Sequence, residues 1–224
     1  MNGVEPLSGP SAEPRSGGPA RQLIILLHGR GANGNDLLGL APPFSELLPD
    51  ARFAAPNAPF VCEQSFGGFE WFHLEDRQPR SFLDGARAAG PQLDAFIDQE
   101  LAASGLGVDK LALVGFSQGT MMSLFVGLRR AENVACILGF SGRLVGAEEL
   151  SHEITARPPV SLITGDADEL IPPEALPEAA KALKAAGVPV EAHVRPGLGH
   201  GIDQEGVEIG RRFVARNLGI KLTS

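Results

Sequence analysis

The sequence predicts an α/β protein with a mostly parallel central sheet and helices on both faces. Apolar runs typical of buried strands alternate with stretches of helical periodicity along the chain, and this alternation favours parallel strands joined by helices. The runs that predict strands are 22–27, 52–55, 110–115, 134–140, 160–164 and 190–194. The stretches that predict helices are 36–48, 82–104, 118–130, 174–186 and 205–218.

The individual elements follow from their local composition. Residues 22–27 form a near-continuous apolar run, which is typical of a strand covered on both faces. In 82–104 the apolar residues recur near helical spacing, but Gly90-Pro91 interrupts them and should kink or break the helix. Segment 56–80 has no period, and such long aperiodic segments in compact domains are uncommon and often functional.

Length and composition indicate one folded domain. The chain has 224 residues, of which 43% are hydrophobic, and this suits a single compact domain with a substantial core, expected over residues 21–224. Residues 1–20 are rich in Pro, Gly, Ser and Glu. They are predicted to be a disordered leader, because they carry too little apolar surface to order themselves.

The charge of the chain argues against several partners. The formal net charge is −8, so the protein has no electrostatic reason to bind nucleic acid or an anionic membrane surface. No apolar run approaches the ~20 residues that a membrane-spanning helix needs. The N-terminus lacks the basic and apolar regions of a signal peptide. We therefore expect a cytoplasmic protein with no transmembrane segment.

The cysteines and histidines do not predict a metal or disulfide framework. Cys62 and Cys136 are the only two cysteines, too few for a disulfide scaffold in a chain of this length. Cys136 lies in a buried-strand run and is interpreted as a small core residue. No His and Cys spacing resembles a zinc site, so we expect no metal and no cofactor.

The segment Gly115-Phe116-Ser117-Gln118-Gly119 carries the main functional signal. It has the pattern Gly-x-Ser-x-Gly, and it lies between an apolar strand run and a stretch that suits a helix. Strand, sharp turn and helix together are the context that makes this pattern a nucleophile elbow. The elbow would lift Ser117 clear of the sheet at the positive end of the helix, which predicts Ser117 as a catalytic nucleophile.

A serine nucleophile needs a base and a group that orients the base. In enzymes with such an elbow the acid and then the histidine follow the serine along the chain. His200 lies in a Gly-rich loop between a strand run and the last helix, where such sheets carry their chemistry, and it is the predicted base. His193 lies within the strand run, and His152 lies in a polar stretch that suggests the surface.

Three carboxylates compete for the role of the acid. Asp166, Asp168 and Glu169 follow the strand run 160–164 in one loop without a regular period. An aspartate directly after a strand commonly bonds its own backbone in a turn, and Asp166 suits that role. The residues alone leave the choice open.

The oxyanion hole is expected to consist of two backbone N–H groups. One belongs to the residue after the nucleophile, Gln118, and the other to the loop that follows the first strand, where we assign it to Arg30. Glycines on both sides of Arg30 let the backbone approach a substrate. His28 is interpreted as a structural residue that braces this loop.

The aromatic segment suggests a substrate pocket. Phe60, Phe66, Phe69, Trp71 and Phe72 all lie in 56–80. They could form an apolar wall for an acyl chain, since ligand pockets are mostly apolar, or they could pack on the core. Trp71, Phe72 and Phe69 are predicted to contact substrate, together with Ser141, which follows another strand.

These motifs together resemble the phospholipase/carboxylesterase family, which has the α/β-hydrolase fold and includes acyl-protein thioesterases. The resemblance covers roughly residues 22–218, and Arg30–Gly34 resembles the bacterial esterase branch. Two positions depart from the family pattern: many members have Leu at Arg30 and an acidic residue at His73. The segments that carry the likeness are Leu27–Gly31, Gly115–Gly119, Gly165–Asp168 with Ile171-Pro172, and Gly197–His200, with Pro56–Pro59 and Trp71-Phe72 beside them.

The resemblance implies a function and completes the site. It implies a catalytic triad of Ser117, Asp168 and His200, with the Arg30 and Gln118 N–H groups as oxyanion donors. We expect a serine carboxylesterase that hydrolyses short- to medium-chain acyl esters of small molecules, and a homodimer is compatible with the sequence. The alternatives are an acyl-thioesterase or a lysophospholipase with the same triad, or a silent hydrolase fold used for binding.

Overall fold

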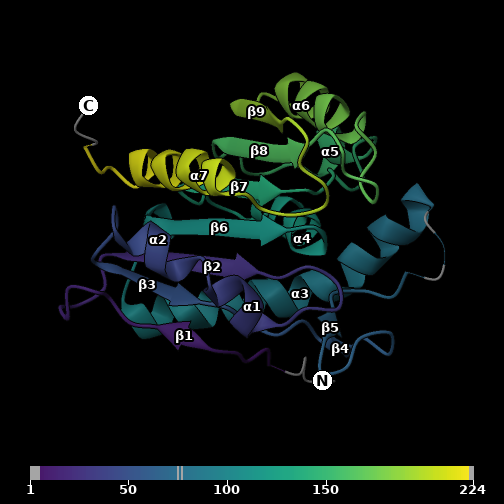
Figure 1. Cartoon of the computed structure of the whole chain (residues 1–224). Helices are drawn as coiled ribbons and strands as arrows, with labels where there is room; N and C mark the ends of the chain where they lie inside the picture. The colour runs from purple at the N-terminus through teal and green to yellow at the C-terminus, as the bar shows by residue number, and fades with distance from the viewer. Residues whose placement is uncertain (1–5, 75, 77, 222–224) are drawn as a thin grey trace.

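Within the described residues, the central sheet has seven strands, with helices on both faces (Figure 1). The computed structural model describes residues 6–74, 76 and 78–221. The strand order is β1-β3-β2-β6-β7-β8-β9, and every neighbouring pair is parallel except β1 with β3. The predicted α/β architecture is therefore confirmed. The strands of the sheet are β1 Ser11–Ala12, β2 Gln22–Leu27, β3 Ala51–Ala54, β6 Leu111–Phe116, β7 Cys136–Phe140, β8 Val160–Gly165 and β9 Val190–Arg195.

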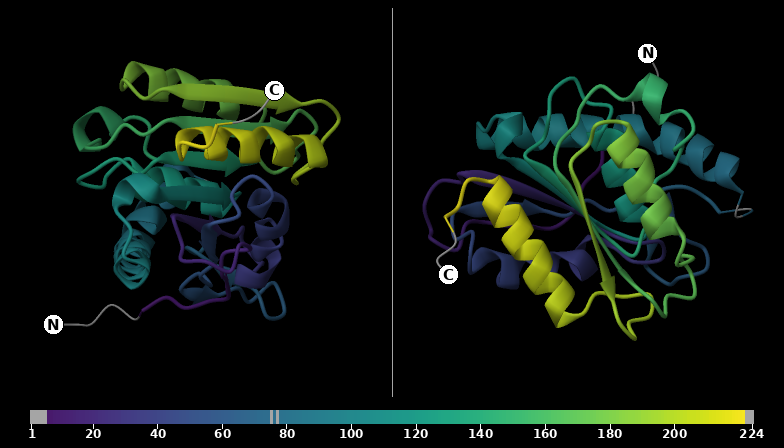
Figure 2. Two further views of the ribbon diagram at one scale, coloured as in Figure 1. Left: turned by 90° about the vertical axis from the view of Figure 1, so that its left-hand side faces the viewer. Right: turned by 90° about the horizontal axis from the view of Figure 1, so that it is seen from above.

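The helices cover the two faces of the sheet in separate groups, as Figure 2 shows from two further sides. Helices α3, α4 and α6 pack into one hydrophobic cluster, and α1, α2 and α7 into the other. Helix α5 is short. The bounds are α1 Gly34–Leu38, α2 Ala41–Ser45, α3 Pro79–Ser104, α4 Gln118–Gly127, α5 Leu150–Glu153, α6 Ala175–Ala185 and α7 Gln204–Asn217.

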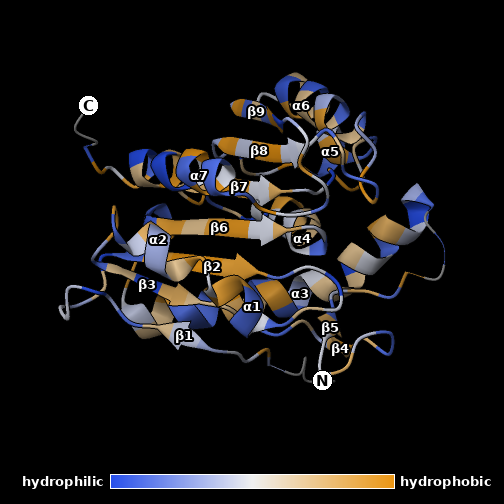
Figure 3. Cartoon of the chain, in the orientation of Figure 1, coloured by the Kyte–Doolittle hydropathy of each residue, from blue (hydrophilic) through white to orange (hydrophobic). Residues whose placement is uncertain are grey.

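Strand β2 shows why the two clusters form. Leu23 and Leu27 belong to the cluster on one face, and Ile24 and Leu26 to the cluster on the other. Successive side chains of a strand point to opposite faces, so an uninterrupted apolar run supplies both. Figure 3 shows β2 and β6 as hydrophobic over most of their length, as expected for strands buried on both faces.

Two predicted helices differ from the observed ones. The helix predicted over 36–48 is split into α1 and α2, because Pro42 and Pro43 have no N–H group to continue α1 and instead lie in the first turn of α2. Gly90-Pro91, predicted to kink or break the helix, lies within α3, and the helix is not broken there. A side chain at Gly90 would press on the ring of Phe125, so this glycine lets α3 pack closely on α4.

The predicted leader is wrong for residues 6–20. Ser11 and Ala12 form β1 and pair antiparallel with Phe53 and Ala54 of β3, and Leu7 is buried. The pairing needs backbone groups only, so the Pro- and Gly-rich composition did not reveal it. Residues 1–5 lie outside the described residues. Segment 56–80 contains a second small sheet, a hairpin of β4 Phe60–Val61 and β5 Phe69–Glu70.

The sequence predicted no transmembrane segment. Among the described residues, no helix combines the length and the apolar character needed to span a membrane.

Candidate active site

Ser117 lies at a sharp turn between β6 and α4. Its backbone has φ 53° and ψ −115°, a conformation that residues other than glycine rarely adopt. Its N–H donates to Phe140 O at 3.0 Å. Strain of this kind persists only where the surroundings hold it, and it clusters at functional sites. The strand, turn and helix that the nucleophile elbow requires are all present here.

Three glycines allow the chain to close around this turn. A Cβ atom at Gly119 would lie 1.8 Å from Leu27 O, and one at Gly115 would lie 2.4 Å from the Gly119 carbonyl. A Cβ at Gly29 would lie 2.9 Å from the Phe116 ring and 3.2 Å from Ser117 Cβ. Any side chain at these positions would therefore push apart the elbow, β2 and the loop that follows it.

His200 and Asp168 form a hydrogen-bonded pair at the same edge of the sheet. The Nδ1 atom of His200 lies 2.8 Å from Asp168 Oδ2 and 3.1 Å from Oδ1. An ionised carboxylate can only accept, so Nδ1–H donates and Nε2 is left with the lone pair of a base. Ser117 and His200 line the same cavity, and their side chains make no hydrogen bond in this structure. Such bonds are often long without substrate.

The environment of Asp168 keeps it charged. Its side chain is fully buried, and burial alone would raise the pKa of the carboxyl group. The N–H group of Ile171, the imidazole of His200 and the N–H group of Leu170 outweigh that effect, and the pKa lies below its ordinary value. Asp168 is thus an anion beside His200, able to stabilise an imidazolium.

The other candidates for the acid and the base lie elsewhere. Asp166 is exposed and accepts the N–H of Gly197 at 2.6 Å, as expected for a turn residue. Glu169 is exposed and has no contact with His200 in the structure. His152 is exposed, and His193 lies on β9 with Nε2 at 3.7 Å from Glu191. Of the three carboxylates, only Asp168 contacts His200.

Two backbone N–H groups are available as oxyanion donors. The N–H groups of Arg30 and Gln118 donate to no other described residue. Gln118 is the first residue of α4, where an N–H group has no partner within the helix. Close contact between Gly29 and the elbow brings the loop of Arg30 beside Ser117. The geometry suits the predicted oxyanion hole.

His28 holds the loop that carries Arg30. Its Nε2 atom accepts the N–H of Ala58 at 3.0 Å, so its Nδ1–H donates to Gly29 O at 2.7 Å. Burial lowers the pKa of His28, and the backbone contact with Gly29 offsets only part of that effect. A neutral, buried ring with both nitrogens bonded is a brace, as the sequence suggested.

A cavity of about 370 Å³ lies over Ser117 and His200. Most of its lining is apolar, which suits a pocket for a small organic substrate. Its walls come from the loops at the carboxyl ends of β2, β6, β7, β8 and β9, from the segment between β5 and α3, and from α3 and α4. The lining residues are Arg30, Leu74, Phe82, Phe116, Ser117, Gln118, Met121, Arg143, Leu170, Ile171, Pro172 and His200.

The four predicted substrate-binding residues do not line this cavity. Trp71 has no exposed surface, and its indole N–H donates to His28 O at 2.9 Å. Phe72 is buried and packs edge-on against Phe82. Phe69 packs against the same core, and Ser141 is buried with its hydroxyl 3.3 Å from Gly201 O. Phe72 thus packs behind the pocket residue Phe82, and Trp71 binds the loop that leads to Arg30 through His28 O.

Several pocket residues were missed in the sequence. Leu170 follows the catalytic acid candidate in the same loop, and Arg143 follows β7 at the same edge of the sheet. The carboxyl ends of parallel strands meet at one edge, so their positions were a usable signal. Phe82 and Met121 lie on helices, and nothing in their spacing separates them from core residues.

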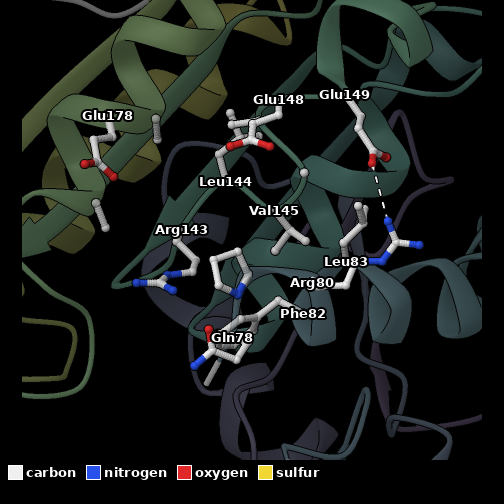
Figure 4. A pocket seen from close by; sticks show the side chains of 15 residues that line it. Gln78, Arg80, Phe82, Leu83, Arg143, Leu144, Val145, Glu148, Glu149 and Glu178 are labelled. Atoms are coloured by element: carbon white, nitrogen blue, oxygen red, sulfur yellow. Dashed lines mark ion pairs between the residues drawn. The ribbon is translucent and has the colours of Figure 1, made fainter. Parts of the chain in front are cut away.

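A second cavity of about 630 Å³ adjoins the first and shares Phe82 and Arg143 with it (Figure 4). It lies between the start of α3, the loop after β7 and α6. Figure 4 shows Glu149 paired with Arg80 on the far side of this cavity from Arg143. Among the described residues, no group of three or more His, Cys, Asp or Glu is placed to hold a metal ion.

Comparisons with known proteins identify relatives over almost the whole chain. A family model described as Phospholipase/Carboxylesterase matches residues 14–218. The crystal structure of esterase PE8 superposes with a TM-score of 0.90 at 42% identity, covering 94% of this chain and 99% of that one. The α/β-hydrolase fold is thereby confirmed.

Two curated relatives differ in what their names say of activity. The "Probable inactive carboxylesterase Os04g0669700" of Oryza sativa is 29% identical, over 89% of this chain and 86% of its own. Acyl-protein thioesterase 1 homolog 1 of Dictyostelium discoideum is 24% identical, over 87% of this chain and 90% of its own.

Proposed function

The chain belongs to the phospholipase/carboxylesterase family, and we propose that it is a serine carboxylesterase for short- to medium-chain acyl esters. Its triad consists of Ser117, His200 and Asp168, with the Arg30 and Gln118 N–H groups as oxyanion donors. The observation that carries the proposal is the strained Ser117 in one cavity with His200, which is itself paired with the buried Asp168. The proposal extends to a cytoplasmic enzyme that needs no cofactor.

The first half of the reaction forms an acyl-enzyme. Ser117 Oγ attacks the ester carbonyl carbon while His200 Nε2 takes the hydroxyl proton. The carbonyl oxygen becomes an oxyanion, which the two N–H groups stabilise. The ester C–O bond then breaks, and the alcohol leaves with the proton from His200. Asp168 stabilises the imidazolium between these two transfers.

The second half releases the acid. A water molecule attacks the acyl-enzyme while His200 Nε2 takes its proton, and the same oxyanion donors act again. The C–O bond to Ser117 breaks, and the proton returns to Ser117 Oγ. One ester and one water thus give one alcohol and one acid, and the enzyme is restored.

Thioesters are the second candidate substrates, because the Dictyostelium relative is named as an acyl-protein thioesterase. The same acyl-enzyme serves both classes, since only the leaving group differs. Paired rates on oxygen esters and thioesters of one acyl chain would rank the two. The other alternative is a hydrolase fold without catalytic activity that serves for binding. It also needs a direct test, because one relative is named as inactive.

Labelling with a fluorophosphonate tests the proposal. This reagent attaches to an activated serine, so the wild-type protein should be labelled and Ser117→Ala should not. Ser141→Ala is the matched control, because Ser141 is the other described non-glycine residue with positive φ and it also follows a strand of the sheet. It should still be labelled. Labelling of Ser117→Ala, or none of the wild type, would contradict the proposal.

A further inference from the structure

A short hairpin holds the loop that carries Arg30. Its strands, β4 and β5, have two residues each, and it lies against the loop that leaves the carboxyl end of β2 (Figure 1). Phe69 O accepts the N–H of Gly31 at 2.8 Å, and the N–H of Phe69 donates to Ala32 O at 2.7 Å. The hydroxyl of Ser65 donates to Gly31 O at 2.7 Å. The hairpin is thus bonded to the loop directly after Arg30.

Glu70 on β5 adds an ion pair to these contacts. Its side chain is buried, and its Oε2 atom accepts the Nε–H of Arg30 at 2.6 Å. The other oxygen, Oε1, lies 2.5 Å from His73 Nδ1, which donates to it. Hydrogen bonds to an ionised group are shorter and stronger than those between neutral groups. Because both of its oxygens are held, the carboxylate of Glu70 has a fixed orientation toward Arg30.

The ion pair matters because the backbone beside Arg30 is free to adopt other conformations. The Arg30 N–H shares one rigid peptide unit with Gly29 O, and His28 Nδ1–H donates to that oxygen. On the other side, Gly31 has φ 79°, and a residue without Cβ does not restrict the chain there. A single two-stranded hairpin is also only marginally stable by itself. The bond to Glu70 therefore fixes the side of Arg30 that the peptide unit before it leaves free.

The same segment reaches the residue of the second oxyanion donor. Trp71 follows Glu70, and its backbone N–H donates to the side-chain oxygen of Gln118 at 3.0 Å. Glu70 and Trp71 thus connect Arg30 with Gln118, the two residues whose N–H groups are the proposed donors. Such donors act on one oxygen atom, so their positions relative to each other decide how well they stabilise it.

We propose that Glu70 is a positioning residue for the oxyanion hole. Its carboxylate holds Arg30 so that the backbone N–H of Arg30 points to the oxyanion that forms in the transition state. Glu70 acts through Arg30, which lines the catalytic cavity. The role rests on the esterase function proposed above, because it needs an oxyanion beside Ser117.

Glu70→Met tests this role, because methionine has a similar length and is only a weak acceptor for Arg30 Nε–H. The kcat on p-nitrophenyl butanoate should fall about 10- to 100-fold, since a misplacement of about 1 Å can cost about 100-fold in rate. KM should change little, because the oxyanion forms only during the reaction. Phenylboronic acid forms a tetrahedral adduct with a serine hydroxyl, so its binding should weaken by a similar factor.

Two further variants separate position from charge. Glu70→Gln keeps an oxygen at the same reach for Arg30 Nε–H and offers an N–H group to His73, so it should recover most of the lost kcat. Glu70→Asp keeps the charge but is one methylene shorter, and it should lose about as much kcat as Glu70→Met. The opposite ranking would overturn the positioning role.

A double variant covers the case in which Glu70→Met does not fold. Arg30→Met/Glu70→Met removes both charges of the pair and leaves neither one buried without its partner, so it should fold. Its kcat and its binding of phenylboronic acid should be as low as those expected of Glu70→Met, because Glu70 acts through the side chain of Arg30. Wild-type values in this double variant would contradict the proposal.

Glu100→Met is the matched control. Glu100 pairs with Arg52 at 3.2 Å, and both side chains are partly buried. Arg52 lies in register with Leu23 near the start of β2, at the opposite edge of the sheet from the catalytic loops. This variant should lower the melting temperature and leave kcat and the binding of phenylboronic acid unchanged.

The outcomes separate the positioning role from the proposed function. Wild-type kcat and wild-type binding of phenylboronic acid in folded Glu70→Met would overturn the positioning role alone. A wild-type protein that neither hydrolyses esters nor is labelled at Ser117 would instead defeat the proposed function.

Discussion

Gln118 ties Trp71 to the turn that carries the nucleophile. The side-chain oxygen of Gln118 accepts the N–H of Trp71 at 3.0 Å, and its amide group donates to Phe72 O at 2.9 Å. The backbone N–H of the same residue is a proposed oxyanion donor. Trp71 in turn donates its indole N–H to His28 O, so one buried ring links the elbow with the loop of Arg30.

Replacing Trp71 should therefore affect stability and leave acyl selectivity unchanged. Trp71→Ala should lose about 3–5 kcal/mol of unfolding free energy, as for other large buried aromatic side chains. The relative rates on short and long esters should stay as in the wild type, because the ring does not line the catalytic cavity. Thermal unfolding and a chain-length series on one variant measure both. Phe66→Ala is the control, since Phe66 lies fully exposed in the same segment and should change neither.

Leu170, and not Trp71, is expected to contact the acyl chain of the substrate. It lines the catalytic cavity and is 52% exposed, so its truncation should cost little stability. Each methylene in an apolar site contributes about 0.8 kcal/mol, or up to about fourfold in kcat/KM per added carbon. That gradient should flatten in Leu170→Ala for the carbons that the side chain contacts. An unaltered gradient would place the acyl chain in another part of the cavity.

The choice of the acid can be tested with one pair of variants. Asp168→Asn should lower kcat by about 10⁴-fold, because an amide favours the wrong tautomer of His200. Asp166→Asn removes the same charge from the same loop, and its amide oxygen can still accept the Gly197 N–H, so turnover should stay near the wild-type value. The opposite ranking would assign the acid to Asp166.

The pH profile should show one ionisation on its acid side. The pKa of Asp168 lies below that of an exposed aspartate, which is about 4, so this carboxylate stays charged above about pH 5 and its effect is lost only as pH falls further. Asp168 should therefore contribute no ionisation to the fall in activity on the acid side of the profile above about pH 5. A plot of log kcat/KM against pH should have a slope of no more than one there. A slope of two would mean that Asp168 takes up a proton in the same range.

The sequence predicted the elements that rest on local pattern. The run 22–27 matches β2 residue for residue, and the elbow context of Ser117 was visible because strand, glycines and helix lie in one short segment. The division of the helix predicted over 36–48 into two helices could have been predicted from Pro42-Pro43. The short strand β1 was not, because its pairing with β3 depends on backbone groups from a distant segment.

The pocket was harder to predict than the catalytic side chains. Trp71 and Leu170 are both large and apolar, and only the tertiary contacts show that one is enclosed while the other borders the cavity. The three carboxylates after β8 could not be ranked locally either. The contact that distinguishes Asp168 comes from His200, which lies far along the chain on the loop after β9.

The central claim is that Ser117 is the nucleophile, and turnover of a p-nitrophenyl ester by Ser117→Ala tests it most directly. The matched control is Ser123→Ala, because Ser123 is buried on α4 and donates only to Gly119 O within the helix. With both variants folded, as judged by thermal unfolding, Ser117→Ala should lose on the order of 10⁴-fold or more in kcat. Ser123→Ala should stay near the wild type. Near-wild-type turnover by folded Ser117→Ala would contradict the account.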